Sequence, residues 1–314
     1  MPQHYRKTFL GLGALFLAGA CTAPAIPALA SSFPVTGARV VAHFDIAALQ
    51  QPENITLGPD GDADVTFAYA HQVAWVTPRG KVTILATLPA AAAGTAAVSG
   101  IVRVPDGTLY VNYVDIGGAE SGIWRVSPDG AAEQVVALPG AKFLNGLAVD
   151  PRTGALFATD STLGVVWKAW PRTGKAQIWT SGAELQPGTS GFGANGLKVH
   201  DGSVWVSNSS QGTLLRIPIR PDGTAGSAAV VASGLAGIDD FAFTGHGDTL
   251  LAAQNQLNQV DLVMPDGTVH IVLTAADGLS GPSAVAVRDR AVYVTSPAYF
   301  TGVDPNLLLA RLAR

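Results

Sequence analysis

Cysteine is almost absent from this chain, since Cys21 is the only one among 314 residues. A disulfide framework and a catalytic cysteine are therefore excluded. Charged residues are also scarce, at 13%, and the formal net charge is −4. This balance offers no basic surface for nucleic acid, so we expect no nucleic-acid partner.

Long apolar runs are missing as well. After residue 30, no stretch approaches the roughly 18 consecutive apolar residues of a membrane helix, so we expect no membrane span. The chain is nevertheless 48% hydrophobic, which argues against disorder. Its 36 glycines and 20 prolines argue against a helical bundle, because both residues are poor in helix interiors.

The first thirty residues have the pattern of a secretory signal peptide. Arg6 and Lys7 precede an apolar run over 9–20, and 28–30 reads Ala-Leu-Ala, a small-residue cleavage site. We therefore expect an exported protein, secreted or extracytoplasmic, with residues 1–30 removed and 31–314 forming one domain. A buried N-terminal helix is the alternative. The segment before Cys21 is an imperfect lipobox, which leaves an N-terminal lipid anchor open.

The remaining sequence is one repeat that occurs six times, at intervals of 44 to 50 residues. Each unit contains short apolar strands separated by turns that are rich in glycine and aspartate. Four strands in a repeat of this length are typical of a propeller blade. The apolar runs are nearly continuous, which fits sheets that pack on both faces. The units begin at Glu53, Ser99, Asn145, Asn195, Asp239 and Ser283.

The chain ends support closure of a ring. The sixth unit stops after its third strand, at 306–312, while an unassigned strand at 38–44 precedes the first unit. This early strand can complete the last blade and leave no exposed sheet edge. We therefore predict an all-β fold, a six-bladed β-propeller with four antiparallel strands per blade. Two stacked sandwiches are the rival architecture.

The residues that begin the repeats should ring the mouth of the central tunnel. Four of them, Glu53, Asn145, Asn195 and Asp239, carry side-chain oxygens, and such oxygens are ligands for hard cations. Two carboxylates match a divalent ion, with calcium preferred and magnesium or manganese left open. The alternative is that these are ordinary turn residues. Candidate supporting residues follow second strands of three units: Asp160, Asn208 and Asn255.

The order of these residues resembles the senescence-marker-protein (regucalcin)/gluconolactonase family. Members of that family bind their metal through a Glu, two Asn and an Asp, with one blade skipped after the Glu. Here Glu53, Asn145, Asn195 and Asp239 follow that order, and Ser99 marks the skipped blade. The resemblance implies a six-bladed propeller that holds a divalent metal.

The same resemblance implies a hydrolase of lactones or related esters. The metal would polarise the carbonyl, and Asp239 would serve as the general base. Sugar-lactone members carry an arginine two residues before the first Asn, where this chain has Phe143. The mouth therefore looks apolar and favours a hydrophobic small-molecule substrate. We predict substrate contacts from Ser99, Phe143, Phe192 and Ser283.

Two other function classes remain open at this point. A non-catalytic extracellular propeller could bind a protein or a small ligand, since this fold serves many functions. A calcium ion could also be purely structural.

Overall fold

The computed structural model describes residues 35–89, 96–115, 120–189 and 191–313. The expectations for residues 1–30, which concern the signal peptide and Cys21, lie outside these residues. No helix in the described ranges is both long and apolar enough to cross a membrane.

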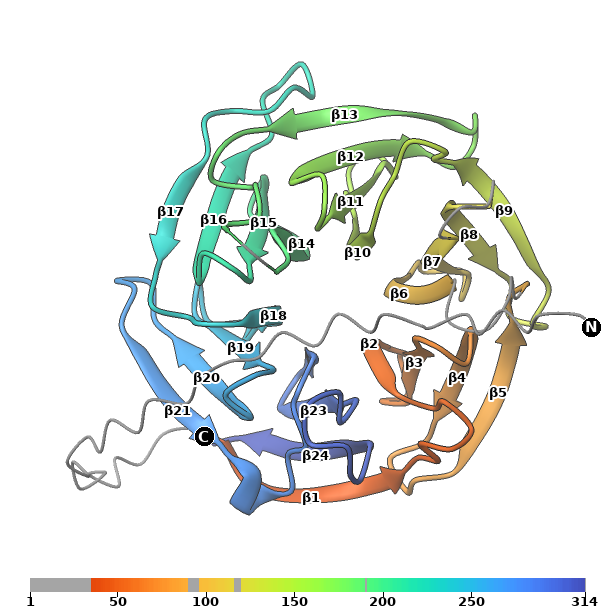
Figure 1. Cartoon of the computed structure of the whole chain (residues 1–314), viewed down its shortest axis with the longest axis vertical. Coiled ribbons are helices and arrows are strands. Elements are labelled where there is room, and N and C mark those ends of the chain that lie inside the picture. Colours follow the sequence, from red (N-terminus) through yellow and green to blue (C-terminus); the bar gives the residue numbers. More distant parts are fainter. Residues whose placement is uncertain (1–34, 90–95, 116–119, 190, 314) are drawn as a thin grey trace, which may run out of the picture. The chain divides into compact units, whose positions relative to one another are not determined.

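The described strands form six four-stranded antiparallel sheets, which we number as blades 1 to 6 (Figure 1). Blade 1 contains β2 (Pro52–Leu57), β3 (Ala63–Phe67), β4 (Gln72–Val76) and β5 (Val82–Thr87). Blade 2 contains β6 (Ala96–Arg103), β7 (Leu109–Asp115), β8 (Gly122–Val126) and β9 (Ala132–Ala137). Blade 3 contains β10 (Leu144–Val149), β11 (Leu156–Asp160), β12 (Val165–Trp170) and β13 (Lys175–Ser181).

The second half of the ring repeats this plan. Blade 4 contains β14 (Ala194–His200), β15 (Ser203–Asn208), β16 (Thr213–Pro218) and β17 (Ala229–Ala232). Blade 5 contains β18 (Ile238–Phe243), β19 (Leu250–Gln254), β20 (Gln259–Val263) and β21 (Val269–Leu273), followed by a single 3-10 turn at Ala275–Asp277. Blade 6 contains β22 (Ala284–Arg288), β23 (Ala291–Ser296), β24 (Asn306–Leu312) and β1 (Val35–His43).

The last blade is closed by the N-terminal strand, as the sequence predicts. β1 pairs antiparallel with β24, with Val35 opposite Leu312 and His43 opposite Asn306. The sheet order of this blade is therefore β1-β24-β23-β22. The predicted six-bladed propeller is confirmed, and two stacked sandwiches are excluded.

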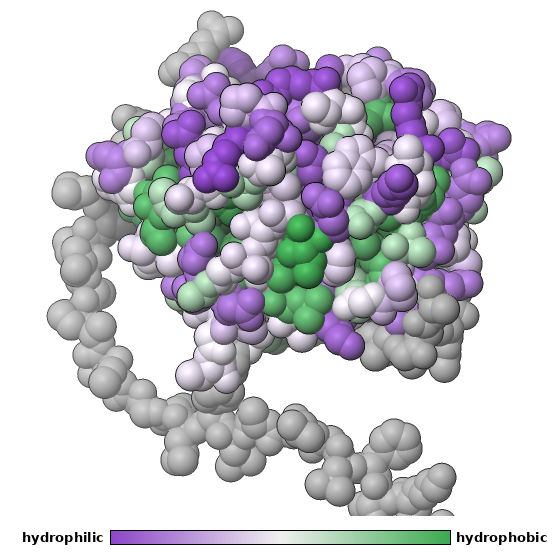
Figure 2. All heavy atoms as spheres, turned by 90° about the horizontal axis from the view of Figure 1, so that it is seen from above, coloured by the Kyte–Doolittle hydropathy of each residue, from purple (hydrophilic) through white to green (hydrophobic). Residues whose placement is uncertain are grey.

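The hydrophobic core is divided among the interfaces between blades. Each core cluster combines residues of two neighbouring blades, for example Phe67 of blade 1 with Tyr293 of blade 6, and Phe157 of blade 3 with Leu197 of blade 4. Sheets that pack on both faces require apolar residues at successive positions, which explains the nearly continuous apolar runs. Seen edge-on, the ring shows mostly hydrophilic side chains, with apolar ones in small groups between them (Figure 2).

The first strand of each blade lies toward the centre of the ring, and the last strand lies at its periphery (Figure 1). The six innermost strands contact one another in cyclic order. This arrangement brings the predicted repeat starts together at one end of the central tunnel.

Candidate functional site

The residues that begin the repeats lie at the beginnings of the innermost strands. Glu53, Asn145, Asn195 and Asp239 each occupy the second position of their strand, on β2, β10, β14 and β18. Ser99 lies within β6, and Ser283 directly precedes β22.

A β-bulge interrupts the innermost strand at this level in blades 1 to 5. In blade 3 the register shifts between Leu144 and Leu147, and in blade 5 between Ile238 and Phe241; blades 1, 2 and 4 shift at the equivalent place. A bulge locally twists a strand and re-aims its side chains. The bulges thus set the direction of the candidate ligands.

Hydrogen bonds between blades fix the backbone carbonyls of the repeat starts. Each bond comes from a buried hydroxyl or amide of a neighbouring blade. Four measured bonds are Thr66 Oγ1 to Ser99 O (2.8 Å), Asn112 Nδ2 to Asn145 O (2.9 Å), Ser207 Oγ to Asp239 O (2.5 Å) and Ser283 Oγ to Glu53 O (2.7 Å). Thr159 donates in the same way to Asn195 O. The carbonyls around the ring are therefore held by side chains that are themselves buried.

A cavity of about 270 Å³ opens above this ring of strand starts. An apolar cavity of about 150 Å³ is enough for benzene, so this one has room for a ring with several further atoms. Predicted site residues that line it are Glu53, Ser99, Phe143, Asn145, Phe192, Asn195, Asp239 and Asn255.

Two carboxylates and two amides, the predicted ligands, lie together in the lining of this cavity. Glu53, Asn145 and Asn195 are buried, while Asp239 is partly buried. Asn255 donates a long hydrogen bond of 3.4 Å from Nδ2 to Asp239 Oδ2, which matches its predicted supporting position. The structure thus brings together the predicted residues of four different blades.

Both carboxylates are destabilised as anions. Burial raises the pKa of Glu53, the Tyr299 hydrogen bond opposes this shift, and the charge of Asp240 adds to it. Burial likewise raises the pKa of Asp239 well above its ordinary value, reinforced by the charges of Glu53 and Asp240. A bound cation would relieve both the desolvation and the mutual repulsion.

The amide of Asn195 is turned so that its oxygen has no protein partner. Its Nδ2 donates to Ser209 Oγ at 2.7 Å, whereas its Oδ1 is buried without a hydrogen bond. The Oδ1 of Asn255 is buried and unpartnered in the same way. A buried polar atom without a partner is costly, and a cation bound beside Asn195 would satisfy its oxygen.

These donors fit a hard divalent cation. In the described part of the chain, no three His, Cys, Asp or Glu side chains meet as a metal cluster. A metal here would therefore be bound by amide oxygens of Asn145 and Asn195 beside the carboxylates of Glu53 and Asp239. Mixed carboxylate and amide oxygens are typical of calcium sites.

Aromatic rings surround the apolar part of the cavity. Phe143 and Phe192 stack with their centroids 4.8 Å apart, and Tyr69 meets Tyr299 edge-on at 5.9 Å. Phe300 also lines the cavity. The described lining includes no lysine, arginine or histidine. Aromatic side chains therefore form the apolar part of the lining, and Phe143 is one of them.

Three predicted residues have other roles in the structure. Ser283 does not line the cavity, because its buried hydroxyl is used on the backbone of blade 1. The carboxylate of Asp160 accepts the backbone N–H groups of Lys142 and Phe143, at 2.7 and 3.1 Å. Asn208 donates to the carbonyls of residues 184 and 186, at 2.9 Å each. Asp160 and Asn208 therefore shape the loops at the rim and do not touch the candidate ligands.

Ser99 shares features with the residues that line the cavity and with those that have other roles. It lines the cavity, but its hydroxyl donates to Leu144 O at 2.8 Å, so the hydrogen is already engaged.

The sequence reasoning missed Tyr299, which lies in the loop between β23 and β24. Its hydroxyl donates to Glu53 Oε2 at 2.6 Å, and burial raises its pKa well above the ordinary value. The preceding residue, Ala298, is buried and has a positive φ of 60°. This left-handed conformation is unfavourable for alanine, and it turns the chain just before Tyr299. A non-repeated loop residue has no equivalent in the other units, so the repeat pattern gave no signal for it.

Comparison with solved structures places the fold among known propellers. Regucalcin, a calcium-binding protein from Agrobacterium tumefaciens, aligns with a TM-score of 0.66 at 16% identity, covering 90% of this chain and 96% of that one. The chain shares its fold. A protein assigned provisionally as a gluconolactonase aligns at 0.64 and 16% identity, covering 88% of this chain and 91% of that one. A streptogramin B lyase aligns at 0.60 and 14% identity, covering 88% and 97%.

Comparisons with protein-family models and with curated protein sequences gave no match. The solved structures confirm the expected resemblance to regucalcin and gluconolactonase propellers at the level of the fold.

Proposed function

We propose that this chain is an exported, divalent-metal-dependent hydrolase of lactones or related esters with an apolar part. The observation that carries the proposal is the buried, unpartnered Oδ1 of Asn195 beside two carboxylates, at the floor of a cavity with aromatic walls. The fold of regucalcin and gluconolactonase propellers supports the same conclusion.

The metal, with calcium preferred, would be bound by Glu53, Asn145, Asn195 and Asp239. When bound, it would supply a Lewis acid that polarises the carbonyl of the substrate. Asp239 would serve as the general base, because its carboxylate lines the cavity beside the other candidate ligands. In the proposed reaction Asp239 accepts a proton from water while the water oxygen forms a bond to the carbonyl carbon. The bond from that carbon to the ester oxygen then breaks, and the leaving oxygen takes the proton.

The aromatic walls would position the substrate. The stacked rings of Phe143 and Phe192 form an apolar surface, while the polar groups gather at the floor. An ester or lactone can therefore bind with its carbonyl toward Asp239 and its hydrocarbon part against the rings. A polar sugar lactone would meet no lysine, arginine or histidine side chain in the described lining.

A substrate panel tests the activity directly. Aryl esters, aliphatic lactones and sugar lactones are incubated with the chain, with and without a chelator, and the products are analysed by mass spectrometry. We expect turnover of the apolar members only, loss of turnover with chelator, and products that have gained one water. Because a lyase shares the fold, products of unchanged mass would indicate elimination.

The alternatives give different outcomes in the same experiment. No turnover of any substrate by a folded chain would favour a non-catalytic binding propeller. No turnover together with a chelator-induced fall in melting temperature would indicate a structural ion.

Paired variants separate metal binding from catalysis. Asn195→Leu removes the oxygen ligand at similar volume, whereas Asn195→Asp retains one. We expect the first to abolish calcium binding and the second to preserve it. Asp239→Asn keeps a ligand oxygen but removes the base, so turnover should fall at least a hundredfold while substrate affinity changes little, as for loss of a general base.

Export is the remaining part of the proposal. The basic and apolar pattern of residues 1–30 supports it. Fractionation of cells that express the full chain, followed by N-terminal sequencing of the product, tests it; a product that still begins at Met1 in the cytoplasm would contradict it.

A further inference from the structure

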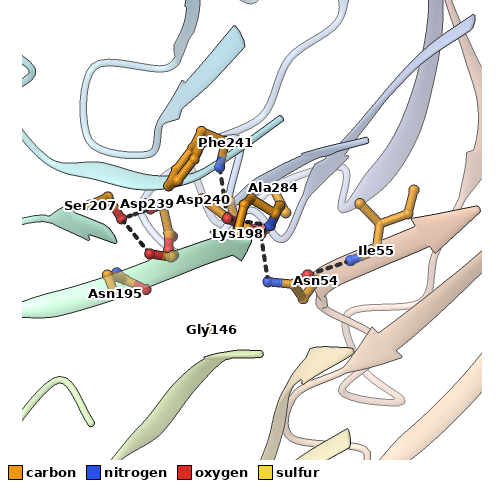
Figure 3. A network of polar contacts seen from close by, with 12 residues as sticks. Asn54, Ile55, Gly146, Asn195, Lys198, Ser207, Asp239, Asp240, Phe241 and Ala284 are labelled. Carbon is orange, nitrogen blue, oxygen red and sulfur yellow. Dashed lines mark hydrogen bonds and ion pairs between the residues drawn. The ribbon is translucent and has the colours of Figure 1, made fainter. Parts of the chain in front are cut away.

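A charged network lies next to the candidate ligands, and the proposed chemistry does not use it (Figure 3). Its asparagine and aspartate are buried, and its lysine is partly buried. Lys198 Nζ donates to both carboxylate oxygens of Asp240, at 2.6 and 2.5 Å. Asn54 Nδ2 donates to Asp240 Oδ2 at 3.0 Å. Asp240 is 2% exposed, and Lys198 is not among the residues that line the cavity.

Every polar atom of this network has a partner, so its geometry is fixed. Asp240 Oδ1 accepts the N–H of Phe241 at 2.8 Å, and Asn54 Oδ1 accepts the N–H of Ile55 at 2.8 Å. The second bond orients the Asn54 amide with its nitrogen toward Asp240. The ammonium of Lys198 also lies 5.6 Å from the centre of the Phe241 ring.

The network connects three of the strands that carry candidate ligands. Asn54 directly follows Glu53 on β2, Asp240 directly follows Asp239 on β18, and Lys198 is on β14 with Asn195. Blades 1 and 5 are not neighbours in the ring, yet the Asn54–Asp240 bond joins them across the tunnel. The Asp240 carboxylate therefore lies close to both ligand carboxylates.

The charges around the tunnel add up in a way that depends on Lys198. A bound cation favours the ionised forms of Glu53 and Asp239. With the cation bound, Glu53, Asp239 and Asp240 contribute three negative charges, and Lys198 contributes one positive charge. Burial is the main cause of the raised pKa values of Glu53 and Asp239, and the charge of Asp240 contributes to both. Asp240 is thus electrostatically coupled to the candidate ligands and is not merely a remote structural group.

We propose that Lys198 neutralises Asp240, so that the ring presents a net charge of −2 instead of −3, which reduces its preference for trivalent over divalent cations. The inference rests on the metal site of the proposed function, but it does not require hydrolysis. Lys198 acts here through Asp240 and is a positioning and charge-setting residue, not a catalytic one.

Terbium and calcium provide the test, because both are hard cations that bind oxygen ligands but differ by one unit of charge. The measured quantity is the ratio of the calcium to the terbium dissociation constant. Changing the site charge by one unit alters the attraction for the trivalent ion more than for the divalent one. At the effective dielectric of a partly buried site, we expect a change in the ratio of about tenfold per unit of charge.

Four proteins cover the charge states. The parent has −2, Lys198→Met has −3, Asp240→Asn has −1, and the double variant returns to −2. The preference for terbium should rise about tenfold in Lys198→Met, fall about tenfold in Asp240→Asn, and match the parent in the double variant. Lys198→Arg retains the charge and should also match the parent.

Stability is controlled within the same set. Removing Lys198 leaves the buried charge of Asp240 uncompensated, so we expect Lys198→Met to be destabilised and the neutral double variant to be less so. If Lys198→Met does not fold, the comparison of Asp240→Asn with the parent and the double variant still shows whether the charge of this network sets the terbium preference.

The outcomes distinguish this inference from the proposed function. If the parent binds calcium but the terbium preference is equal in all folded variants, the charge-setting role is overturned and the metal site stands. Equal losses of both affinities would show a purely structural network and would also overturn it. If the parent binds neither ion, both the inference and the metal-dependent function are overturned.

Discussion

The innermost strands pack closely at Gly146, which directly follows the candidate ligand Asn145. We therefore predict that a larger residue at this position disturbs the metal site. A Cβ at this position would lie 2.5 Å from Asn195 O and 2.6 Å from Leu197 N, both backbone atoms of the next blade. Ordinary contact begins near 3.4 Å, so Gly146→Ala must separate the two strands by about 0.9 Å. Backbone atoms within a sheet cannot move aside as a flexible side chain could.

This separation acts directly on the spacing of Asn145 and Asn195. Metal sites require ligand distances within about 0.2 Å of their preferred values, so a 0.9 Å shift exceeds that tolerance severalfold. We expect Gly146→Ala to lose calcium binding by at least a hundredfold. Overpacking of this kind costs about 1–3 kcal/mol of stability, so the chain should still fold.

Gly140→Ala is the matched control, because a Cβ there meets nothing within 4 Å. Calcium affinity is measured by isothermal titration calorimetry and stability by thermal unfolding in the presence of chelator. Gly140→Ala should match the parent in both assays. Gly146→Ala with parental calcium affinity would refute the reasoning, since it would show that the spacing of these strands does not set the site.

Three further predictions concern single side chains. Burial raises the pKa of Asp261 to about 6, a shift that the Gln259 hydrogen bond opposes. The folded state therefore holds this proton more tightly than the unfolded state, and stability falls as pH rises from about 4 to about 6. Asp261→Asn should be more stable by about 3 kcal/mol at pH 7.5 and no more stable below pH 4 in urea unfolding; an equal gain at both pH values would contradict this. Phe143→Arg should raise the KM for apolar esters about tenfold and lower the KM for anionic lactones. Phe143→Leu is the control. Tyr299→Phe should weaken calcium binding about tenfold through loss of the bond that orients Glu53, and unchanged affinity would remove Tyr299 from the site.

Much of the fold could be predicted because short stretches of sequence mark the strands and turns of each repeat. Turn residues such as those at 128–130 and 221–223 mark strand ends, and apolar runs mark strands. The closing strand could be predicted by counting, since the sixth unit ends one strand short. These features depend on backbone conformation and burial, which neighbouring residues specify.

The candidate ligands could be predicted because equivalent positions in a repeat occupy equivalent positions in the ring. Side-chain direction does not follow from that equivalence. Ser283 begins its repeat as Ser99 does, but blade 6 pairs regularly from Ala284 onward, without the register shift of blades 1 to 5. Both hydroxyls donate to a backbone carbonyl of the following blade, yet only Ser99 lines the cavity, a difference that no spacing in the sequence reveals.

Contacts across the ring could not be predicted from the sequence. Asn54 and Asp240 are 186 positions apart, and their hydrogen bond depends on how six blades close. Asp160 and Asn208 look equivalent to Asn255 as residues after second strands, yet only Asn255 contacts a candidate ligand. Asp160 instead accepts hydrogen bonds from backbone N–H groups of the loop before β10. Asn208 donates to backbone carbonyls of the loop before β14.

The central claim is that the ring of Glu53, Asn145, Asn195 and Asp239 binds a divalent cation. The most direct test is the anomalous difference density of a crystal grown with calcium. The account predicts one peak at the floor of the aromatic cavity, with oxygens of these four side chains about 2.3–2.6 Å away. A crystal with no peak there at saturating calcium, or with the peak bound by other residues, would contradict the account.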